Sequence, residues 1–557
     1  MRYLPIVIVV LLLVAFIALG MLTHWAWHLP ATLCAFALVI GIYDFFQPHH
    51  SVLRNYPILG HFRWFAEDIR PEIQQYFIER DTDGKPFSRD ARSLVYERAK
   101  DAHGEKAFGT ELNVYASGYE WFTHSIAPKH ARGTSESGQS DARQGRPTSA
   151  TSGKPPSTNG GLPDYQERVK IGGPQCQKPY EMSLFNVSAM SFGSLSSNAI
   201  RALNTGAKMG GFAHDTGEGG LTKYHLEPGG DLVWEIGSGY FGCRTRDGQF
   251  DLDTFTQKAQ HDHVKCVSVK LSQGAKPGLG GVMPAEKVTP EIAEIRGVPV
   301  GEKCISPPYH TAFQTPRELL TFVETLREAT GGKPTGFKLC IGRPSEFFGI
   351  CKAMLETGIQ PDFIIVDGSE GGTGAAPLEF EDHVGTPLTE GLIFVHNALI
   401  GCGLRGQIKI GCSGKVTSSF EMARRIAIGA DYCNAARGMM FALGCIQAMR
   451  CQTNRCPVGV ATQDPQRVRA LVVPLKAERV FNYHRNTVLS FNQLIASLGL
   501  DSPSQLNQRL LMRRVNPTLV QSYEQLYPTL EAGILLGDQV PEHLRDDWNT
   551  ANADRFS

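Results

Sequence analysis

The sequence carries no net charge and no framework of paired cysteines, and each absence narrows the range of functions. Lys plus Arg number 55, as do Asp plus Glu, so the charge gives no indication of a nucleic-acid or acidic partner. The 13 cysteines are scattered and odd in number. That usage argues against a secreted disulfide scaffold and favours a reducing compartment, the cytoplasm.

Hydrophobic residues are almost missing from residues 132–161, RGTSESGQSDARQGRPTSATSGKPPSTNGG. Such a segment cannot bury enough apolar surface to fold, so we predict a disordered linker. A collar of helices and loops is expected before it, over residues 49–131. Within the collar, Glu67–Arg80 has helical spacing, with Pro71 where a first turn tolerates proline.

Charge is also missing from the N-terminus. Residues 3–22 hold no charged side chain, and about 20 apolar residues suffice to cross a bilayer. A second apolar run, residues 31–46, contains one charge, Asp44. We interpret residues 1–48 as a transmembrane hairpin joined by THWAWHLP, whose tryptophans suit a membrane–water interface. A cleaved signal peptide is the alternative for the first run, but no clear small-x-small cleavage site follows it and a second apolar run does.

The orientation of this hairpin follows from the positive charges beside it. Arg54, Arg63 and Arg70 follow the second run, whereas the loop between the runs has no Lys or Arg. The positive-inside rule then places both chain ends in the cytoplasm. The expected location is the inner (cytoplasmic) membrane, with the folded part of the chain facing the cytoplasm.

From Gly172 onward, short apolar segments alternate with helical ones, which is typical of a parallel α/β sheet. Strands are expected at 265–271, 335–341, 361–368, 407–414 and 431–438, and helices at 318–331 and 418–430. Glycine or charge follows nearly every strand, as in a (β/α)8 TIM barrel that builds its site at the carboxyl ends of its strands. A doubly wound sheet is the alternative, because strand periodicity does not distinguish a closed sheet from an open one. We place this domain at residues 162–480 and a helical extension at 481–557.

One glycine motif lacks the helix that its function needs. Gly237, Gly239 and Gly242 in GSGYFG match the dinucleotide pattern G-x-G-x-x-G. The next residues, CRTRDGQFD, do not form an amphipathic helix, so no helix N-terminus is available to bind a pyrophosphate. We therefore predict no nicotinamide site here.

Three cysteines lie close together in RGMMFALGCIQAMRCQTNRCPVGVATQDP, residues 437–465. Cys445, Cys451 and Cys456 form a C-x5-C-x4-C run. No fourth Cys or His is near, because the next histidine is His484, which argues against zinc. Three thiolates followed by Cys-Pro suit an iron–sulfur cluster. The alternative is three small buried side chains of the core.

Glycine-rich and charged loops follow several of the predicted strands. The last two strands end in residues 412–415 and 436–439, where barrel enzymes often bind phosphate. The loop DGSEGGTGAAP, residues 367–377, has enough glycine for its backbone to lie against a flat or anionic ligand. VKLSQGAKPGLGG places Lys270, Gln273 and Lys276 at a strand end, where a lysine can stabilise negative charge. Glu218 lies between glycines in HDTGEGG. Ordinary exposed turns and a solvated lysine are the alternatives.

These stretches occur in the order that they have in the synthase domain of glutamate synthases. SFGS, TGEGG, KLSQGAKPG, ISPPYH, DGSEGGTGAAP and CPVGVATQDP resemble that domain's signatures over roughly residues 172–465. A membrane hairpin joined to a lone synthase barrel resembles the FMN-binding glutamate synthase family proteins. The resemblance implies a (β/α)8 barrel with FMN and a [3Fe-4S] cluster, preceded by two transmembrane helices.

The resemblance also implies roles for individual residues. Lys270 would lie at the flavin, where it stabilises the anionic reduced ring, and Glu218 is a second catalytic candidate. Gln273, Lys276 and Arg296 would hold the carboxylates of 2-oxoglutarate. The cysteines of the 445–456 run would bind the cluster. The other cofactor-binding candidates are Ser191 and Gly193 near the ring, Gly371 and Gly372, and Ser413, Gly414, Lys415, Arg437, Gly438 and Met439 near the phosphate.

The sequence departs from the family pattern at several points. Leu279 stands where GAKPGEGG has glutamate, the phosphate loop TDGQLKTG reads GCSGKVTSS, and Cys243 replaces a residue that is usually not cysteine. We also expect neither a glutaminase domain with its N-terminal cysteine nor a second nucleotide-binding domain for NADPH. Nitrogen would then come from ammonia, a separate glutaminase subunit or an amine, and electrons from an external donor such as ferredoxin or a reductase.

The expected activity is the reductive amination of 2-oxoglutarate to glutamate by an oxidoreductase acting on CH–NH2 donors. An N-substituted glutamate synthase that uses an amine such as methylamine is one alternative. A membrane-tethered flavin and iron–sulfur protein that transfers electrons or senses redox state is another. An inactive scaffold that has kept the barrel is the third.

Overall fold

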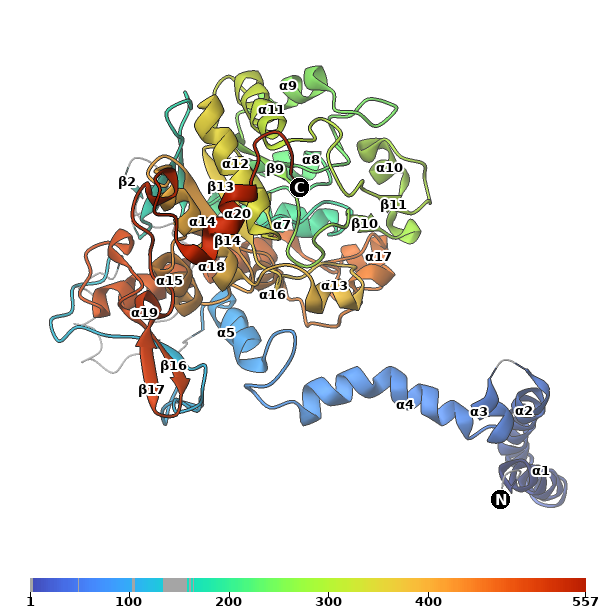
Figure 1. Ribbon diagram of the computed structural model, residues 1–557. Coiled ribbons are helices and arrows are strands. Elements are labelled where there is room, and N and C mark those ends of the chain that lie inside the picture. The colour runs from blue at the N-terminus through green and yellow to red at the C-terminus, as the bar shows by residue number, and fades with distance from the viewer. Residues whose placement is uncertain are drawn as a thin grey trace. The chain divides into compact units, whose positions relative to one another are not determined.

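The computed structural model describes residues 4–48, 50–102, 106–133, 158–159, 162–163 and 165–556. The chain forms two compact units, Met1–Arg89 and Asp90–Ser557, which are traced in colour from blue to red in Figure 1. The predicted linker, residues 132–161, lies almost entirely outside the described residues.

The first unit begins with two apolar helices that pack side by side. They are α1 (Leu4–Leu22) and α2 (His28–Phe46), joined by the short 3-10 helix η1 (Trp25–Trp27). The spans Leu4–Leu22 and Trp25–Phe46, the second of which includes η1, are long and apolar enough to cross a membrane by length and composition, with mean hydropathies of 3.1 and 1.9. The second helix extends the predicted apolar run by one turn at its N-terminal end.

The rest of this unit is α3 (Ser51–Asn55), α4 (Gly60–Ile73) and the π-helix η2 (Gln74–Ile78). The predicted start of the collar helix was wrong, because α4 begins seven residues before Glu67 and Pro71 lies inside it rather than in its first turn. The apolar spacing of Phe62, Phe65 and Ile69 carries the helical period upstream of Glu67. Proline lacks the N–H that an interior turn needs, and the helix changes to π geometry three residues after it.

The second unit is built on a closed barrel of eight parallel strands, which confirms the predicted (β/α)8 fold and excludes the doubly wound alternative. The strands, in chain order, are β6 (Phe185–Val187), β7 (His214–Asp215), β8 (Leu232–Ile236), β9 (Val264–Lys270), β12 (Thr335–Leu339), β13 (Phe363–Asp367), β14 (Lys409–Ser413) and β15 (Tyr432–Ala435). The last strand pairs with the first and closes the barrel. The five predicted strands correspond to β9 and β12–β15.

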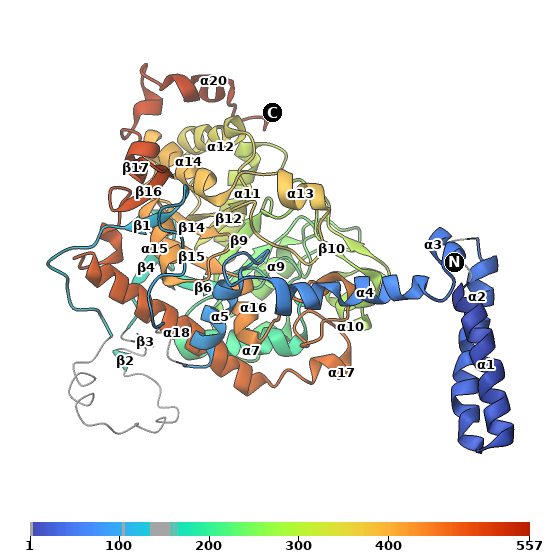
Figure 2. The ribbon, with the colours of Figure 1, turned by 90° about the horizontal axis from the view of Figure 1, so that it is seen from below.

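Helices follow the strands and surround the barrel, as the two views in Figures 1 and 2 show. They are α7 (Ser197–Gly210), α8 (Lys223–Leu226), α9 (Leu252–Ala259), α11 (Pro316–Ala329), α12 (Pro344–Thr357), α14 (Leu388–Gly401), α15 (Ser419–Ala427) and α16 (Arg437–Leu443). Side chains that accept from the first-turn N–H groups start several of them, among them Ser196, Thr315 and Ser418. Each such cap stabilises its helix by about 1 kcal/mol.

Loops after the strands carry smaller elements. These are β10 (Val282–Met283), η3 (Ala285–Lys287), α10 (Pro290–Arg296), β11 (Cys304–Ile305), α13 (Leu378–His383), η4 (Cys451–Thr453) and α17 (Pro465–Val468). The segment Gly237–Asp251 after β8 contains no helix, so GSGYFG does not open a phosphate-binding helix.

A hairpin covers the amino ends of the barrel strands. Its strands are β4 (Arg168–Ile171) and β5 (Tyr180–Ser183), and Ile171 and Met182 from this hairpin are at most 1% exposed. They pack with barrel residues such as Val233, Phe363 and Tyr432 in one apolar cluster. This end of the barrel is therefore part of the core, which leaves the opposite end for a site.

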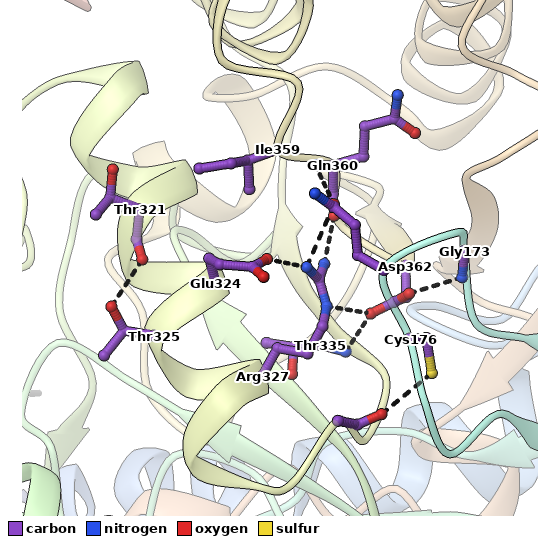
Figure 3. Close-up of polar contacts among 12 residues, drawn as sticks. Gly173, Cys176, Thr321, Glu324, Thr325, Arg327, Thr335, Ile359, Gln360 and Asp362 are labelled. Atoms are coloured by element: carbon purple, nitrogen blue, oxygen red, sulfur yellow. Dashed lines mark hydrogen bonds and ion pairs between the residues drawn. The ribbon is translucent and has the colours of Figure 1, made fainter.

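A buried ion pair ties α11 to the starts of two strands at the same end (Figure 3). The Arg327 Nε atom is 3.0 Å from Asp362 Oδ2, and both side chains are at most 2% exposed. Arg327 also pairs with Glu324 and donates to the backbone oxygen of Gln360. Asp362 accepts from the backbone N–H of Thr335 at 2.8 Å. Neither charge is left without a partner in the dry interior.

The chain on both sides of the barrel packs against it. The long helix α18 (Val473–Ser497) lies against α7. A three-stranded sheet joins β1 (Glu120–Phe122) from the collar to β16 (Leu511–Asn516) and β17 (Leu519–Ser522) from the C-terminal extension. The remaining elements are α5 (Arg89–Ala99), β2 (Thr158–Asn159), β3 (Leu162–Pro163), η5 (Pro503–Gln505), α19 (Tyr523–Leu526), η6 (Ile534–Leu536) and α20 (Glu542–Thr550).

Candidate active site

The carboxyl ends of the barrel strands bring together an acid and a lysine that are far apart in the sequence. Lys270 is the last residue of β9, and Glu218 lies in the loop after β7. Lys270 Nζ is 3.1 Å from Glu218 Oε1 and donates to the side-chain oxygen of Gln273 at 2.5 Å. Only 9% and 15% of the two charged side chains are exposed, so little water screens their attraction.

Glycines from two other loops have no side chain to fill the space that Glu218 occupies. A Cβ atom at Gly237 would lie 2.7 Å from Glu218 Cβ, and one at Gly281 would collide with the carboxylate. In the acid's own loop, Gly217 has a φ of +65°, which favours glycine. The glycine frame expected from TGEGG is present, and the structure extends it with glycines after β8 and β9.

The charged side chains around the Glu218 carboxylate are mostly cationic. Burial by itself would raise the pKa of Glu218, but Lys270, followed by Arg296 and Lys276, outweighs it and lowers that pKa. The acid is therefore ionised at neutral pH and partly neutralises three cations. The remaining positive charge suits a ligand with more than one negative group.

A pocket of about 510 Å³, counting its opening to solvent, lies beside this pair. Glu218, Gln273, Lys276 and Arg296 all line it. The structure thus gathers most of the predicted catalytic and substrate-binding residues around one space.

Arg296 reaches this pocket from the last turn of α10 and is 5% exposed. Its Nη2 donates to the Phe192 backbone oxygen at 3.2 Å and to Ser191 Oγ at 3.4 Å. The guanidinium lies over the Phe241 ring, 4.8 Å from its centroid. These contacts hold the guanidinium plane in place, and a fixed plane is what a paired N–H contact with a carboxylate requires.

Lys276 joins two of the loops around the pocket. Its Nζ atom donates to the backbone oxygen of Ala375 at 2.9 Å, and the residue is 2% exposed. Burial lowers the pKa of Lys276, and the negative charge of Glu218 partly offsets that effect. A bound carboxylate would stabilise its charged form further.

Asp367, at the end of β13, connects the predicted phosphate loop with the lysine loop. Ser413, at the end of β14, donates from its hydroxyl to one Asp367 oxygen, and the N–H of Gly274 donates to the other at 2.8 Å. Beyond Ser413 the chain turns sharply, with φ of +149° at Gly414 and +51° at Lys415. The three predicted phosphate-loop residues therefore lie in one turn above the barrel.

Arg437 connects the other predicted cofactor-binding segments. Its Nη2 donates to the backbone oxygen of Thr373 at 2.6 Å, and a Cβ atom at Gly372 would lie 3.0 Å from Arg437 Nε. Gly371 precedes this contact in the loop after β13. A Cβ atom at Gly438 would meet the Tyr483 hydroxyl at 2.6 Å, and the Met439 side chain is fully buried. Any ligand contact of these last two residues is therefore limited to the backbone.

Ser191 and Gly193, expected near the flavin ring, follow β6. Ser191 lines the pocket. Gly193 has a φ of +99°, and a Cβ atom there would approach Met283 Cε to 2.5 Å. Met283 also lines the pocket, so Gly193 packs behind the pocket wall.

The three-cysteine segment borders the same pocket. Cys451 is among the lining residues, and its sulfur is 3.9 Å from Arg437 Nη1. The Tyr96 hydroxyl donates to the backbone oxygen of Cys445 at 2.6 Å, and Cys456 is 6% exposed. All three are free thiols. In the described part of the chain no three His, Cys, Asp or Glu side chains are close enough to hold a single metal ion; cluster thiolates bind different irons and need a wider spacing.

Comparison with known proteins assigns the family. The model for the conserved region in glutamate synthase matches residues 161–501. The glutamate synthase large subunit-like protein YerD of Bacillus subtilis is 38% identical over 491 residues, which cover 85% of this chain and 92% of that one. The chain belongs to the glutamate synthase family. The family predicted from the sequence is confirmed, and with it the class of glutamate synthase-like oxidoreductases.

Other members of the glutamate synthase family are longer than the matched region. The archaeal glutamate synthase [NADPH] of Methanocaldococcus jannaschii is 34% identical over 323 residues, which cover 58% of this chain and 60% of that one. The large chain of glutamate synthase [NADPH] from Bacillus subtilis is 31% identical, with 20% of its length covered. Among solved structures, a flavocytochrome b2 mutant with pyruvate bound matches with a TM-score of 0.40 and 11% identity, covering 86% of this chain and 91% of that one.

Two residues, one in the pocket wall and one behind Lys270, were not singled out from the sequence. Lys287 lines the pocket, is 3% exposed and donates to the Ser194 backbone oxygen at 3.1 Å. Its stretch, AEKVTP, carries no motif. His310 donates from Nε2 to the backbone oxygen of Lys270 at 2.8 Å, and burial lowers its pKa to about 4. The signature ISPPYH contains His310, but only the fold shows that it supports Lys270.

The interior of the barrel contains several charged side chains, whereas branched apolar residues usually dominate the core of such a barrel. Lys338 on β12 is 3.0 Å from Glu235 on β8, and both are at most 7% exposed. Asp215 on β7 lies near this pair. Burial, and then the charge of Glu235, raise the pKa of Asp215 to about 8. Asp215 therefore carries a proton at neutral pH, which spares the interior a further charge.

The raised pKa of Asp215 predicts a pH-dependent stability. An unfolded aspartate ionises near pH 4, whereas folded Asp215 keeps its proton until about pH 8. The folded state thus binds more protons at Asp215 between these values, so the contribution of Asp215 to folding stability is most favourable below about pH 4 and is lost as the pH rises to about 8. We expect Asp215→Asn to remove this component, so that its unfolding midpoint declines less than that of the wild type between pH 5 and pH 8. If the unfolding midpoints of the two proteins changed with pH in parallel, Asp215 would already be ionised in the folded state at pH 5 and the prediction would be wrong.

Proposed function

We propose that this chain catalyses the reductive amination of 2-oxoglutarate to glutamate with FMN and an iron–sulfur cluster, anchored in the cytoplasmic membrane by its N-terminal hairpin. The observation that carries the proposal is the excess of buried positive charge around one acid, Glu218. Lys276, Lys287 and Arg296 line the same pocket as this acid, and Lys270 pairs with it from beside the pocket. This excess of positive charge over one carboxylate matches a dicarboxylate substrate. Family membership supports the choice of reaction.

The positions of the pocket residues suggest a separate role for each of them. Arg296 and Lys276 line the space with buried charges, so they would bind the substrate carboxylates through charge-assisted hydrogen bonds. Gln273 already accepts a hydrogen bond from Lys270, which leaves its amide N–H groups for a carboxylate. Lys270, held by Glu218 and by the His310 contact to its backbone, would stabilise negative charge at the reaction centre.

FMN would be held at the carboxyl ends of the strands. The turn at Gly414 and Lys415 lies over β14, and Arg437 begins the helix after the neighbouring strand β15. Two cations and a sharp glycine turn on adjacent strands fit the phosphate of such a cofactor. When bound, FMN supplies the hydride chemistry that no protein side chain provides.

Cys445, Cys451 and Cys456 would hold the [3Fe-4S] cluster. The fit rests on donor chemistry, since three free thiols lie in one segment and one of them borders the pocket. Thiolates are the usual ligands of iron–sulfur clusters. Electrons would enter from an external donor such as ferredoxin or a reductase, and nitrogen from ammonia, an amine or a separate glutaminase subunit.

The proposal is tested by an anaerobic titration of detergent-purified full-length protein, followed by absorbance and EPR. We expect flavin bands, an iron–sulfur signal, and reoxidation of reduced flavin on addition of 2-oxoglutarate with ammonia. Cys451→Ser should lose iron and the EPR signal, whereas Cys243→Ser, a buried cysteine outside the 445–456 run, should keep both. Methylamine in place of ammonia tests the N-substituted glutamate synthase.

A second candidate is a membrane-tethered flavin and iron–sulfur protein that transfers electrons without making glutamate. Leu279 favours it, because a leucine, 38% exposed, stands in the lysine loop where glutamate synthases have an acid. Both cofactors present, with reduced flavin that does not respond to 2-oxoglutarate and ammonia, would replace the first proposal with this one.

A further inference from the structure

The helical segment after the apolar hairpin exposes one apolar face. In α4 and η2, Phe62, Phe65, Ile73 and Phe77 are 71%, 59%, 39% and 84% exposed. Their spacing of three, eight and four residues places them on one side of the helix. Large aromatic side chains in such a row are not left in water on a stable surface unless a partner covers them.

Charged side chains occupy the other side of the same helix. Arg63 and Glu67 form an exposed i,i+4 ion pair with an Nε–Oε1 distance of 2.8 Å. Around the helix axis, their positions lie roughly 80–140° from those of Phe62 and Ile73. Phe62, Phe65, Ile73 and Phe77 thus share one side of segment 60–78, and the Arg63–Glu67 pair lies on another side. Trp64 is on the side of that pair, next to His61.

A buried polar contact fixes the start of α4 to the end of α2. Asp44, on the last turn of α2, is fully buried. It accepts from the backbone N–H of Ile58 at 2.9 Å and lies 2.9 Å from His61 Nε2, on the first turn of α4. The Trp64 ring lies beside the His61 ring, with centroids 6.4 Å apart. Asp44, the charged residue of the second apolar run, thus connects α2 with the start of α4.

The direction of α4 follows from this junction. Figure 2 shows α4 running across the direction of α1 and α2 rather than along it. A helix that leaves the end of a membrane-crossing pair at such an orientation runs parallel to the membrane surface.

We infer that segment 60–78 lies in the headgroup region of the leaflet where α2 ends, with its aromatic face toward the acyl chains. This inference rests on the proposed transmembrane hairpin. Amphipathic helices with aromatic residues on one face and charges on the other bind at this depth, and Arg63 and Arg70 would meet lipid phosphates.

Photo-crosslinking of the full-length protein in vesicles of phosphatidylethanolamine and phosphatidylglycerol tests this placement. Benzoylphenylalanine is incorporated at one position at a time, in place of Phe65, Phe77, Glu67 or Phe36, and adducts are identified by mass spectrometry. Glu67 is the matched control, since it lies on the charged face of the same helix with 53% of its side chain exposed. Phe36, on α2 and 67% exposed, reports on the hairpin alone.

We expect lipid adducts at Phe65 and Phe77 with yields similar to that at Phe36 and about tenfold or more above that at Glu67. Lipid adducts at Phe36 with none at Phe65 and Phe77 would reject the placement of segment 60–78 at the membrane surface but would be consistent with the transmembrane hairpin. Adducts from Phe65 or Phe77 to residues 90–557, or to a second copy of the chain, would overturn it in favour of a protein partner. A lack of lipid adducts at Phe36 as well would reject the hairpin and the inference together.

Discussion

Lys270→Ala is expected to slow the reductive amination of 2-oxoglutarate by about 10²- to 10³-fold while FMN stays bound, because it removes one preorganised positive charge from the reaction centre. Lys270 is the last residue of β9 and is held between Glu218 and Gln273. Its loss also leaves the buried Glu218 with fewer cations, so the pKa of that acid should rise from its lowered value. Stopped-flow reoxidation of reduced flavin by 2-oxoglutarate and ammonia measures the effect.

A second lysine of the same strand provides the control for this experiment. Lys265 lies on β9, is 36% exposed and pairs with Asp231 on the surface, so Lys265→Ala should leave turnover within about twofold, as expected for an exposed pair. Lys270→Arg keeps the charge but not the geometry of a compact ammonium and should remain slow. Turnover of Lys270→Ala within twofold of the wild type would remove Lys270 from the reaction, and loss of bound flavin would assign it to cofactor binding instead.

Arg327→Met is expected to lower the free energy of unfolding by about 3–5 kcal/mol, because it leaves a buried charge without its partner. Arg327 and Asp362 are at most 2% exposed and lie 3.0 Å apart at the amino ends of the barrel strands. Methionine fills much of the same volume but leaves Asp362 with backbone N–H donors only. Unfolding in urea, followed by far-UV circular dichroism of the detergent-solubilised protein, measures the change.

The same helix carries the matched control for this substitution. Arg317 lies in the first turn of α11 and makes ion pairs with Asp554 and Glu356 at the surface, where its side chain is 38% exposed. Arg317→Met should change stability little, since water screens exposed pairs and replaces their contacts. Equal destabilisation by the two substitutions would show that the buried network of Figure 3 contributes no more than a surface pair.

Much of the barrel was predictable because its strands are buried on both faces and read as continuous apolar runs. The run FIIV within residues 361–368 stands out in this way, and the structure places β13 there. The strand β7 has only two residues, His214 and Asp215, and no run of that length is visible in a sequence. The start of α4 was misplaced because helical spacing shows that a helix exists but does not mark its first residue.

The candidate site was predictable where its residues lie in dense motifs. Lys270, Gln273 and Lys276 lie within seven residues of one another, and the fold places two of them on the pocket and Lys270 beside it. Lys287 and His310 stayed unassigned, since each depends on a contact with a distant loop: one with the Ser194 backbone and the other with the Lys270 backbone. The roles of all these residues remain predictions for the experiments above.

The sequence alone determined the family, the alternation of strands and helices, and the apolar character of the N-terminus, because these depend on local pattern and on residues that are near one another in the chain. The tertiary structure decided that the sheet is closed, that Glu218 pairs with Lys270, and that Asp44 joins α2 to α4. Each of these brings together groups separated along the chain, and their energies depend on distance and burial. Neither quantity can be read from the order of the residues, because both arise only when the chain has packed.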